Sequence, residues 1–149
     1  MRLIPAAAAH AADLAQVHAQ AFDRPWPASD IAALLDSPGV FGFLAVEDRP
    51  GAMILCRAVL DEAEILTVGT APAFRRRGAA RALVEICAET ARSAGAASLF
   101  LEVAVDNLAA VGLYESLGFQ RTGLRAGYYD RGVHGKVDAL AMRRDLNAG

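Results

Sequence analysis

The sequence predicts an α+β domain built around one mixed sheet. Its predicted elements follow the order β-α-α-β-β-β-α-β-α-β-β, and the three consecutive strands in the middle favour an antiparallel meander. Apolar residues make up 54% of the 149 residues and charged residues 21%, which suits one buried core. Neither an internal repeat nor a linker divides the chain. We therefore expect a single domain over residues 1–149.

The first half of the chain carries signals for a strand, two helices and the meander. Leu14 and Val17 recur at helical spacing, and the sequence Pro25-Trp26-Pro27 ends that helix. Ser29 or Asp30 can cap the second helix. The expected strands cover residues 2–5, 40–46, 52–60 and 64–70, and the expected helices cover residues 10–22 and 29–35.

The second half begins with a long amphipathic helix and ends in two strands. Gly95 closes the long helix at the usual position, and Gly118 ends the helix that follows. Asp106 or Asn107 is expected as the N-cap of that later helix. The expected helices cover residues 76–94 and 107–117, the strands cover residues 98–105, 119–124 and 137–143, and a loop covers residues 128–136.

Composition and charge exclude several classes of function. The net charge of −2 gives no broad basic surface for direct binding of nucleic acid or of an anionic membrane. No signal peptide is recognisable, and no stretch reaches the roughly 18 to 20 apolar residues of a membrane span. Cys56 and Cys87 lack ligand spacing, so we expect buried thiols and a reducing cytoplasm. His10, His18 and His134 are isolated, so we expect surface or capping roles and no metal site.

Arginines and small residues gather between the last meander strand and the long helix. Small residues let backbone N–H groups approach a ligand, and the dipole and free amides of a helix N-terminus favour an anion such as pyrophosphate. Arginines also cluster on solvated surfaces, so the segment alone leaves a surface role open. It is neither a Walker nor a Rossmann motif. Its residues are Arg75, Arg76, Arg77, Gly78, Ala79, Ala80 and Arg81.

Glu102 is a lone carboxylate in an apolar strand. Burial raises the pKa of a carboxyl group toward values that suit a general base near neutral pH. The alternative is that Glu102 lies near a strand end, where it pairs with an arginine or reaches water.

Tyr114 follows Asn107 by seven residues, which is about two helical turns. Both side chains can therefore lie along one side of a helix that begins beside the strand of Glu102. The tyrosine hydroxyl would then overlook the end of that strand. The alternatives are an aromatic residue at the edge of the core for Tyr114 and a helix cap for Asn107.

Together these features resemble the GNAT superfamily of N-acetyltransferases over a core of residues 61–119. The superfamily's Gln/Arg-x-x-Gly-x-Gly/Ala signature is matched by Arg75, Gly78 and Ala80. Further similarity is to the RimI type, which acetylates the amino-terminal alanine of a ribosomal small-subunit protein. This similarity is carried by Asp61-Glu62-Ala63, Arg81-Ala82-Leu83, Leu101-Glu102-Val103, Asn107, residues 113–119, Tyr128-Tyr129 and Asp138-Ala139.

The resemblance implies a mostly antiparallel sheet with helices on both faces and strands that splay at an acetyl-CoA site. It implies that acetyl-CoA is the acetyl donor and that no metal takes part. The cofactor would contact the backbone of one strand, the arginine-rich segment and the start of the next helix. The implied contact residues are Val68, Gly69, Thr70, Arg76, Arg77, Gly78, Ala79, Ala80, Arg81 and Asn107, and Arg75 belongs to the same signature.

For the reaction, the resemblance implies that Glu102 is the general base and Tyr114 the general acid, on either side of the thioester. The acceptor would be the N-terminus of a peptide or protein, possibly a ribosomal protein. It would be bordered by Trp26, Tyr128 and Tyr129. The sequence departs from the RimI pattern at residue 104, where an alanine replaces an arginine shortly after the base, so the identity of the acceptor stays open.

Two other functions remain open at the level of the sequence. The same chemistry can act on a small-molecule amine or on a lysine side chain. A module that binds acyl-CoA without turnover would belong to another class, and filled positions for both proton-handling residues argue against it.

Overall fold

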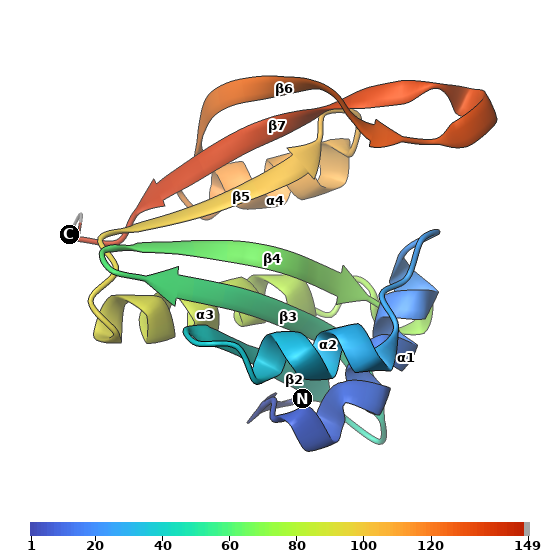
Figure 1. Ribbon diagram of the computed structural model, residues 1–149, viewed down its shortest axis with the longest axis vertical. Helices are drawn as coiled ribbons and strands as arrows, with labels where there is room; N and C mark the ends of the chain where they lie inside the picture. The colour runs from blue at the N-terminus through green and yellow to red at the C-terminus, as the bar shows by residue number, and fades with distance from the viewer. Residues whose placement is uncertain (148–149) are drawn as a thin grey trace.

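A seven-stranded sheet runs through the computed structural model, which describes residues 1–147 (Figure 1). Its strand order is β1-β2-β3-β4-β5-β7-β6, and every neighbouring pair is antiparallel except β4 and β5. This confirms the mixed, mostly antiparallel sheet. The strands are β1 (Arg2–Pro5), β2 (Val40–Val46), β3 (Pro50–Val59), β4 (Glu62–Thr70), β5 (Ser98–Ala104), β6 (Gln120–Asp130) and β7 (Lys136–Asp145).

Helices cover both faces of the sheet, as expected. α1 (Ala11–Ala21) and α2 (Ala28–Leu35) pack on one face, and α3 (Ala79–Ser93) and α4 (Leu108–Ser116) pack on the other (Figure 1). In β3, Met53 and Leu55 face α1 and α2, whereas Ile54 and Cys56 face α3. Because successive strand residues point to opposite faces, the apolar run of β3 fits burial on both sides. None of the helices within residues 1–147 is long and apolar enough to cross a membrane.

The parallel strands β4 and β5 run together for only part of their length. They pair at Glu62 with Ser98, at the next residue of each strand, and at Glu64 with Phe100. Beyond this point β4 continues to Thr70 and stays paired with β3, while β5 stays paired with β7. The two halves of the sheet therefore part toward the carboxyl ends of these strands and leave a gap between them (Figure 1).

A one-residue bulge in β4 changes which residues face α1. Cys56 pairs with Ile65 but the preceding Leu55 pairs with Thr67, so Leu66 is an extra residue in the ladder. Before the bulge, Ile65 packs into the cluster beside α3. After it, Thr67 and Gly69 contact side chains of α1. Sequence alternation alone does not reveal this reversal.

The predicted bounds are correct for β1 and β2 and differ at two functionally placed segments. α3 begins at Ala79, not at residue 76, because Arg76 and Gly78 have φ values of 63° and 76°, which a helix does not accommodate. Tyr128 and Tyr129 were expected in a loop but lie on β6. That strand resumes pairing after an irregular stretch, with Tyr129 opposite Val137.

Candidate active site

The strand β4 presents an open backbone edge to the gap. Val68, Gly69 and Thr70 pair with β3 on one side, and no strand within residues 1–147 pairs with them on the other. A Cβ atom on Gly69 would lie 2.9 Å from Phe22 Cε2 and 3.0 Å from Ala21 Cβ. The resemblance implies that this glycine contacts the cofactor, and the structure adds that it makes room for the end of α1.

Glu102 lies on the β5 side of the same gap. Its side chain is 23% exposed, and Oε1 lies 2.9 Å from Nη2 of Arg125 on β6. Oε2 is buried and has no hydrogen-bond partner within residues 1–147. The sequence left open whether Glu102 is a buried carboxylate or pairs with an arginine. The structure combines both, since Oε1 pairs with Arg125 and Oε2 is buried without a partner among residues 1–147. A buried acceptor without a donor costs about 1–3 kcal/mol, so Oε2 favours the approach of a hydrogen-bond donor.

Tyr114 and Glu102 approach the gap from opposite faces of the sheet. Leu101 and Val103 point into the same core cluster as Tyr114, so Glu102, which lies between them, points to the other face. The two side chains therefore flank the gap without facing each other directly. Burial, with a smaller contribution from Tyr129, raises the pKa of Tyr114 to about 12. The phenol consequently keeps its proton at neutral pH.

Tyr129 interacts electrostatically with both of these groups. Burial and, to a smaller extent, the negative charge of Glu102 raise the pKa of Tyr129. The electrostatic interaction with Tyr129 also contributes to the raised pKa of Tyr114. The ring of Tyr128 packs edge-on against that of Tyr129 at 5.0 Å, and the Arg125 guanidinium lies 4.5 Å from the Tyr128 ring. Sequence reasoning missed Arg125, because its pairing with Glu102 depends on the register of three strands.

The first turn of α3 leaves the backbone amides that we predict to bind phosphate without partners in the helix. Gly78 is the N-cap residue in a left-handed conformation, and no side chain caps the helix. Ala82 N is the first amide to bond back to Gly78 O, so the amides of Ala79, Ala80 and Arg81 have no acceptor inside the helix. A Cβ atom on Gly78 would meet nothing within 4 Å, so the space beside the N-cap residue itself is open.

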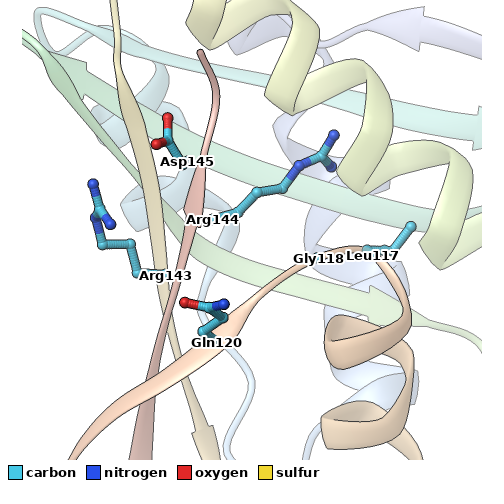
Figure 2. Close-up of a pocket in the computed structure, with 6 residues that line it drawn as sticks. All are labelled: Leu117, Gly118, Gln120, Arg143, Arg144 and Asp145. Atoms are coloured by element: carbon cyan, nitrogen blue, oxygen red, sulfur yellow. The ribbon is translucent and has the colours of Figure 1, made fainter. Parts of the chain in front are cut away.

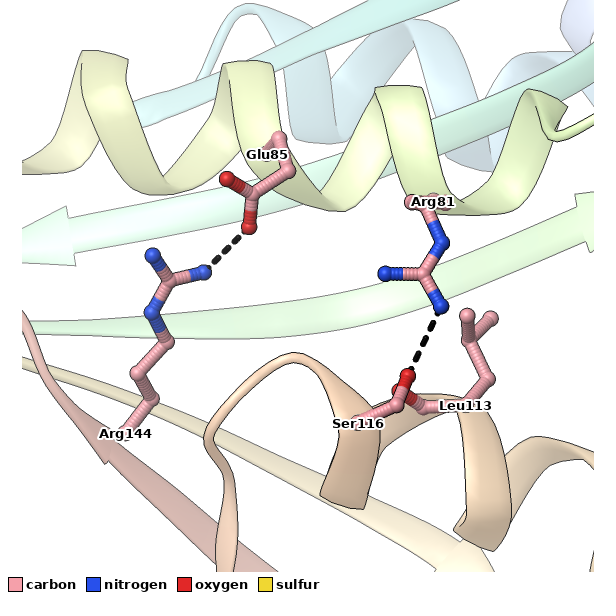
Figure 3. A network of polar contacts seen from close by, with 5 residues as sticks. All are labelled: Arg81, Glu85, Leu113, Ser116 and Arg144. Carbon is pink, nitrogen blue, oxygen red and sulfur yellow. Dashed lines mark hydrogen bonds and ion pairs between the residues drawn. The ribbon is translucent and has the colours of Figure 1, made fainter.

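The arginine side chains of this segment divide into two groups. Arg77 pairs with Glu47 at 2.7 Å, and Arg81 donates to Ser116 Oγ at 2.8 Å, which connects α3 with α4 (Figure 3). These two guanidinium groups are therefore engaged with the protein itself. The side chains of Arg75 and Arg76 make no hydrogen bond or ion pair within the part of the chain that the structure describes.

Asn107 is the N-cap of α4, as the capping interpretation predicts. Its Oδ1 accepts a hydrogen bond from Ala110 N at 3.3 Å. The preceding Asp106 accepts two hydrogen bonds from Arg131, which ties the turn before α4 to the β6–β7 turn. Asp106 and, more weakly, Asp23 raise the pKa of Arg131. The α1–α2 segment, which contains Asp23, therefore lies near the β6–β7 turn.

Trp26 lies in the α1–α2 segment beside His18. The two rings stack with their centroids 5.0 Å apart, and His18 is buried, with 2% of its surface exposed. The expected surface or capping role for His18 is therefore wrong. Its spacing of four residues from Leu14 and one from Val17 places it on the apolar side of α1, which was the available signal. No group of three or more potential metal ligands occurs within residues 1–147.

Comparison with known proteins decides the family. The family described as "Acetyltransferase (GNAT) family" matches residues 11–119. The chain belongs to the GNAT acetyltransferase family. The gap between β4 and β5, the unpaired amides at the start of α3 and the half-buried Glu102 all lie within the matched residues.

Several GNAT proteins are similar to this chain. The ribosomal protein bS18-alanine N-acetyltransferase of Salmonella typhimurium is 39% identical over 99 residues, and the chain spans 66% of its length. The N-alpha-acetyltransferase RimI of Mycobacterium tuberculosis is 39% identical over 138 residues, which cover 88% of this chain and 84% of that protein. The crystal structure of the Escherichia coli ribosomal-protein-S18-alanine N-acetyltransferase superposes with a TM-score of 0.88 at 27% identity, covering 99% of this chain and 96% of that one.

A separate pocket lies away from the GNAT gap. It has a volume of about 520 Å³ and lies at the carboxyl end of β7, which pairs with the first residues of β5 (Figure 2). Glu102 is further along β5, where it pairs with Ala141. Arg143 donates to Ser98 Oγ at 2.8 Å, and Arg144 pairs with Glu85 of α3 (Figure 3). The pocket is lined by Leu117, Gly118, Gln120, Arg143, Arg144 and Asp145.

Proposed function

We propose that this GNAT protein transfers an acetyl group from acetyl-CoA to the α-amine of a protein N-terminus. The amino-terminal alanine of a ribosomal protein of the S18 type is the first acceptor to test, because the similar proteins are named for that activity. The observation that carries the proposal is Glu102 Oε2, a buried oxygen that has no partner within residues 1–147 and belongs to β5, the strand that parts from β4. The free thiols of Cys56 and Cys87 fit our proposal of a cytoplasmic enzyme.

The residues around the gap fit acetyl-CoA. The amides of Ala79, Ala80 and Arg81 would hold the pyrophosphate, helped by the Arg75 and Arg76 side chains. The open edge of β4, formed by Val68, Gly69 and Thr70, would bind the pantetheine arm through the backbone groups of Val68 and Thr70 that face the gap, and Asn107 would border the cofactor from the start of α4. Acetyl-CoA would supply the acetyl group as a thioester.

Glu102 is suited to remove a proton from the acceptor. An ammonium group cannot attack a thioester, and an α-amine with a pKa of about 7.7–8.0 loses its proton more readily than a lysine with a pKa of about 10.4. Glu102 Oε2 would take this proton directly or through one water molecule, while Arg125 holds the other oxygen. Trp26, Tyr128 and Tyr129 would border the acceptor peptide.

A backbone amide of β4 and Tyr114 would stabilise the charges that the reaction creates. The amide would be that of Val68 or Thr70, next to Gly69 on the open edge, because Gly69 itself directs its N–H toward Met53 of β3. Such a donor to the oxyanion is worth roughly 3–4 kcal/mol. As the carbon–sulfur bond breaks, Tyr114 would donate its proton to the departing thiolate. With its pKa raised to about 12, Tyr114 holds that proton until it is needed.

The test is an acetylation assay with four peptides and acetyl-CoA. The peptides begin with alanine, serine or methionine, or carry a blocked N-terminus and one internal lysine. We expect fast acetylation of the alanine peptide, with the acetyl group on its α-amine by mass spectrometry. Preference for the lysine peptide, or for a polyamine in a parallel reaction, would contradict the proposed acceptor. Tight binding of CoA without transfer to any acceptor would contradict acetyl transfer itself.

A further inference from the structure

His18 is a buried polar residue to which the mechanism above assigns no step. Its Nδ1 accepts a hydrogen bond from the backbone N–H of Trp26 at 3.1 Å, and its Nε2 lies 3.3 Å from Thr67 Oγ1 on β4. The imidazole is stacked against two aromatic rings, with centroids 4.3 Å away for Phe22 and 5.0 Å away for Trp26. Both ring nitrogens therefore have a partner, and the ring also stacks on two aromatic side chains.

These contacts permit one protonation state of His18. Nδ1 must be unprotonated to accept from the amide, so the neutral ring carries its proton on Nε2 and donates it to Thr67 Oγ1. An imidazolium ion would lose the acceptor that the Trp26 amide needs. Burial lowers the pKa of His18 and so favours the same neutral form.

The hydrogen bond from the Trp26 amide is important for the order of the α1–α2 segment because of the two prolines beside it. Pro25 and Pro27 lack a backbone N–H group, so Trp26 carries the one backbone donor of this tripeptide. Among residues 1–147, it is also the only hydrogen bond made by the backbone of residues 23–26. The order of the α1–α2 segment therefore depends on His18 more than on its own backbone.

The same residue connects this segment to the gap. Thr67 faces α1 because of the bulge at Leu66, so the contact from His18 reaches the strand that borders the gap. Next along β4, Gly69 admits the ring of Phe22. In Figure 1 the α1–α2 segment extends past the end of β4, on the side of the β6–β7 hairpin.

We infer that His18 is a positioning residue for the acceptor site. Its Nε2–H tautomer fixes the α1–α2 segment against β4, so that Phe22 and Trp26 form a preorganised wall where the first residue of the acceptor enters. This inference rests on the proposed function, because the wall borders an acceptor only if acetyl transfer takes place in the gap. A residue needed for packing alone would act through its volume, whereas His18 acts through an acceptor nitrogen.

Two substitutions separate the hydrogen bond from the stack. His18→Phe keeps a ring between Phe22 and Trp26 but removes both hydrogen bonds, and His18→Asn keeps an acceptor near the position of Nδ1 but removes the ring. We expect His18→Phe to raise the KM of the alanine peptide about tenfold while the KM of acetyl-CoA stays within about twofold. The KM of the alanine peptide for His18→Asn is expected to lie closer to that of the unmodified protein.

His10→Phe is a matched control. It removes a hydrogen bond of the same kind, from Ala7 N–H to His10 Nδ1 at 2.9 Å, at an exposed position before α1. Both KM values should stay unchanged in this variant. The inference is wrong if His18→Phe leaves the peptide KM unchanged, if it raises both KM values equally, or if His18→Asn is as impaired as His18→Phe.

Nuclear magnetic resonance of the full chain tests the positioning without an acceptor. The nitrogen shifts of His18 should show protonation at Nε2, and the Trp26 amide should exchange slowly with solvent. His18→Phe should abolish that protection, and His18→Asn should keep most of it. Protonation at Nδ1, or an unchanged Trp26 amide in His18→Phe, overturns the inference. If these signals behave as expected and no peptide is acetylated, the proposed function fails instead.

Discussion

Arg125 binds one oxygen of Glu102 at 2.9 Å, and the other oxygen is buried without a partner among residues 1–147. The ion pair therefore holds the carboxylate by one oxygen and leaves the second available to accept a proton. In the proposed mechanism that oxygen receives the proton of the acceptor.

Replacing Glu102 by glutamine should slow acetyl transfer most at low pH. At pH 6.5 the α-amine carries a proton that must be removed, and loss of a general base should lower kcat/KM by about 10²-fold. At pH 9 the amine is already neutral, so the deficit should shrink. Initial rates with the alanine peptide at both pH values measure this, and an equal deficit at the two pH values would argue against a base.

Replacing Arg125 by glutamine should destabilise the protein by about 1 kcal/mol, because it leaves a half-buried carboxylate without its cation. Arg121→Gln is the control, since Arg121 on the same strand pairs with exposed Glu115 at 3.3 Å. That change should stay within about 0.5 kcal/mol. Urea unfolding at pH 7.5 measures the free energy of unfolding of the two variants. An equal decrease in both would mean that the ion pair with Glu102 stabilises the protein no more than an exposed ion pair does.

Tyr114→Phe should lower kcat by about 10²-fold and leave the KM of acetyl-CoA nearly unchanged, because only the proton donor is removed. The pKa of Tyr114 is about 12, so the phenol stays protonated up to about pH 10, and kcat of the unmodified protein should not fall with pH in that range because of Tyr114. A pH series of kcat checks this. Near normal turnover by the phenylalanine variant would remove Tyr114 from the mechanism.

The stability of the protein should fall between pH 7.5 and pH 5.5. Burial lowers the pKa of His18 below the 6.5 of the unfolded state, so the unfolded chain binds the proton more readily. The contribution of His18 is therefore complete above pH 6.5 and is lost as the pH falls toward the folded-state pKa. Denaturant titrations at the two pH values should show a smaller decrease for His18→Phe than for the unmodified chain.

Cys56 and Cys87 should be unreactive in the folded protein. Both thiols are fully buried, and burial together with the neighbouring Cys87 thiol raises the pKa of Cys56. A colorimetric thiol reagent should react with neither cysteine in native buffer and with both in guanidinium chloride. Fast reaction of either thiol without denaturant would mean that the interface of β3 and α3 opens.

The local sequence specified the elements well, because apolar spacing, capping residues and glycines act over a few positions. β1 and β2 have the predicted bounds, and Asn107 caps α4 as its position suggested. The misses depend on interactions between distant segments. The bulge at Leu66 follows from packing against α1, and the strand at Tyr128 and Tyr129 follows from pairing with β7.

The same reasoning explains what was missed in the candidate site. The composition of the strand around Glu102 predicted a buried carboxylate, but its arginine partner lies 23 residues away on a strand whose register no local pattern specifies. His18 carried a usable signal in its spacing on α1. Its tautomer could not be predicted, because that depends on a backbone amide and a threonine from two other segments.

The parting of β4 and β5 also has a mechanical consequence. Strand pairing joins the two halves of the sheet over only three residues, supplemented by side-chain bridges such as Arg81 to Ser116 (Figure 3). A molecule that lies between the two strands would take the place of the absent strand pairing and would restrict the motion of one half of the sheet relative to the other. The donor substrate would then stiffen the sheet as well as react. After its product leaves, the two halves of the sheet would again move more freely relative to each other.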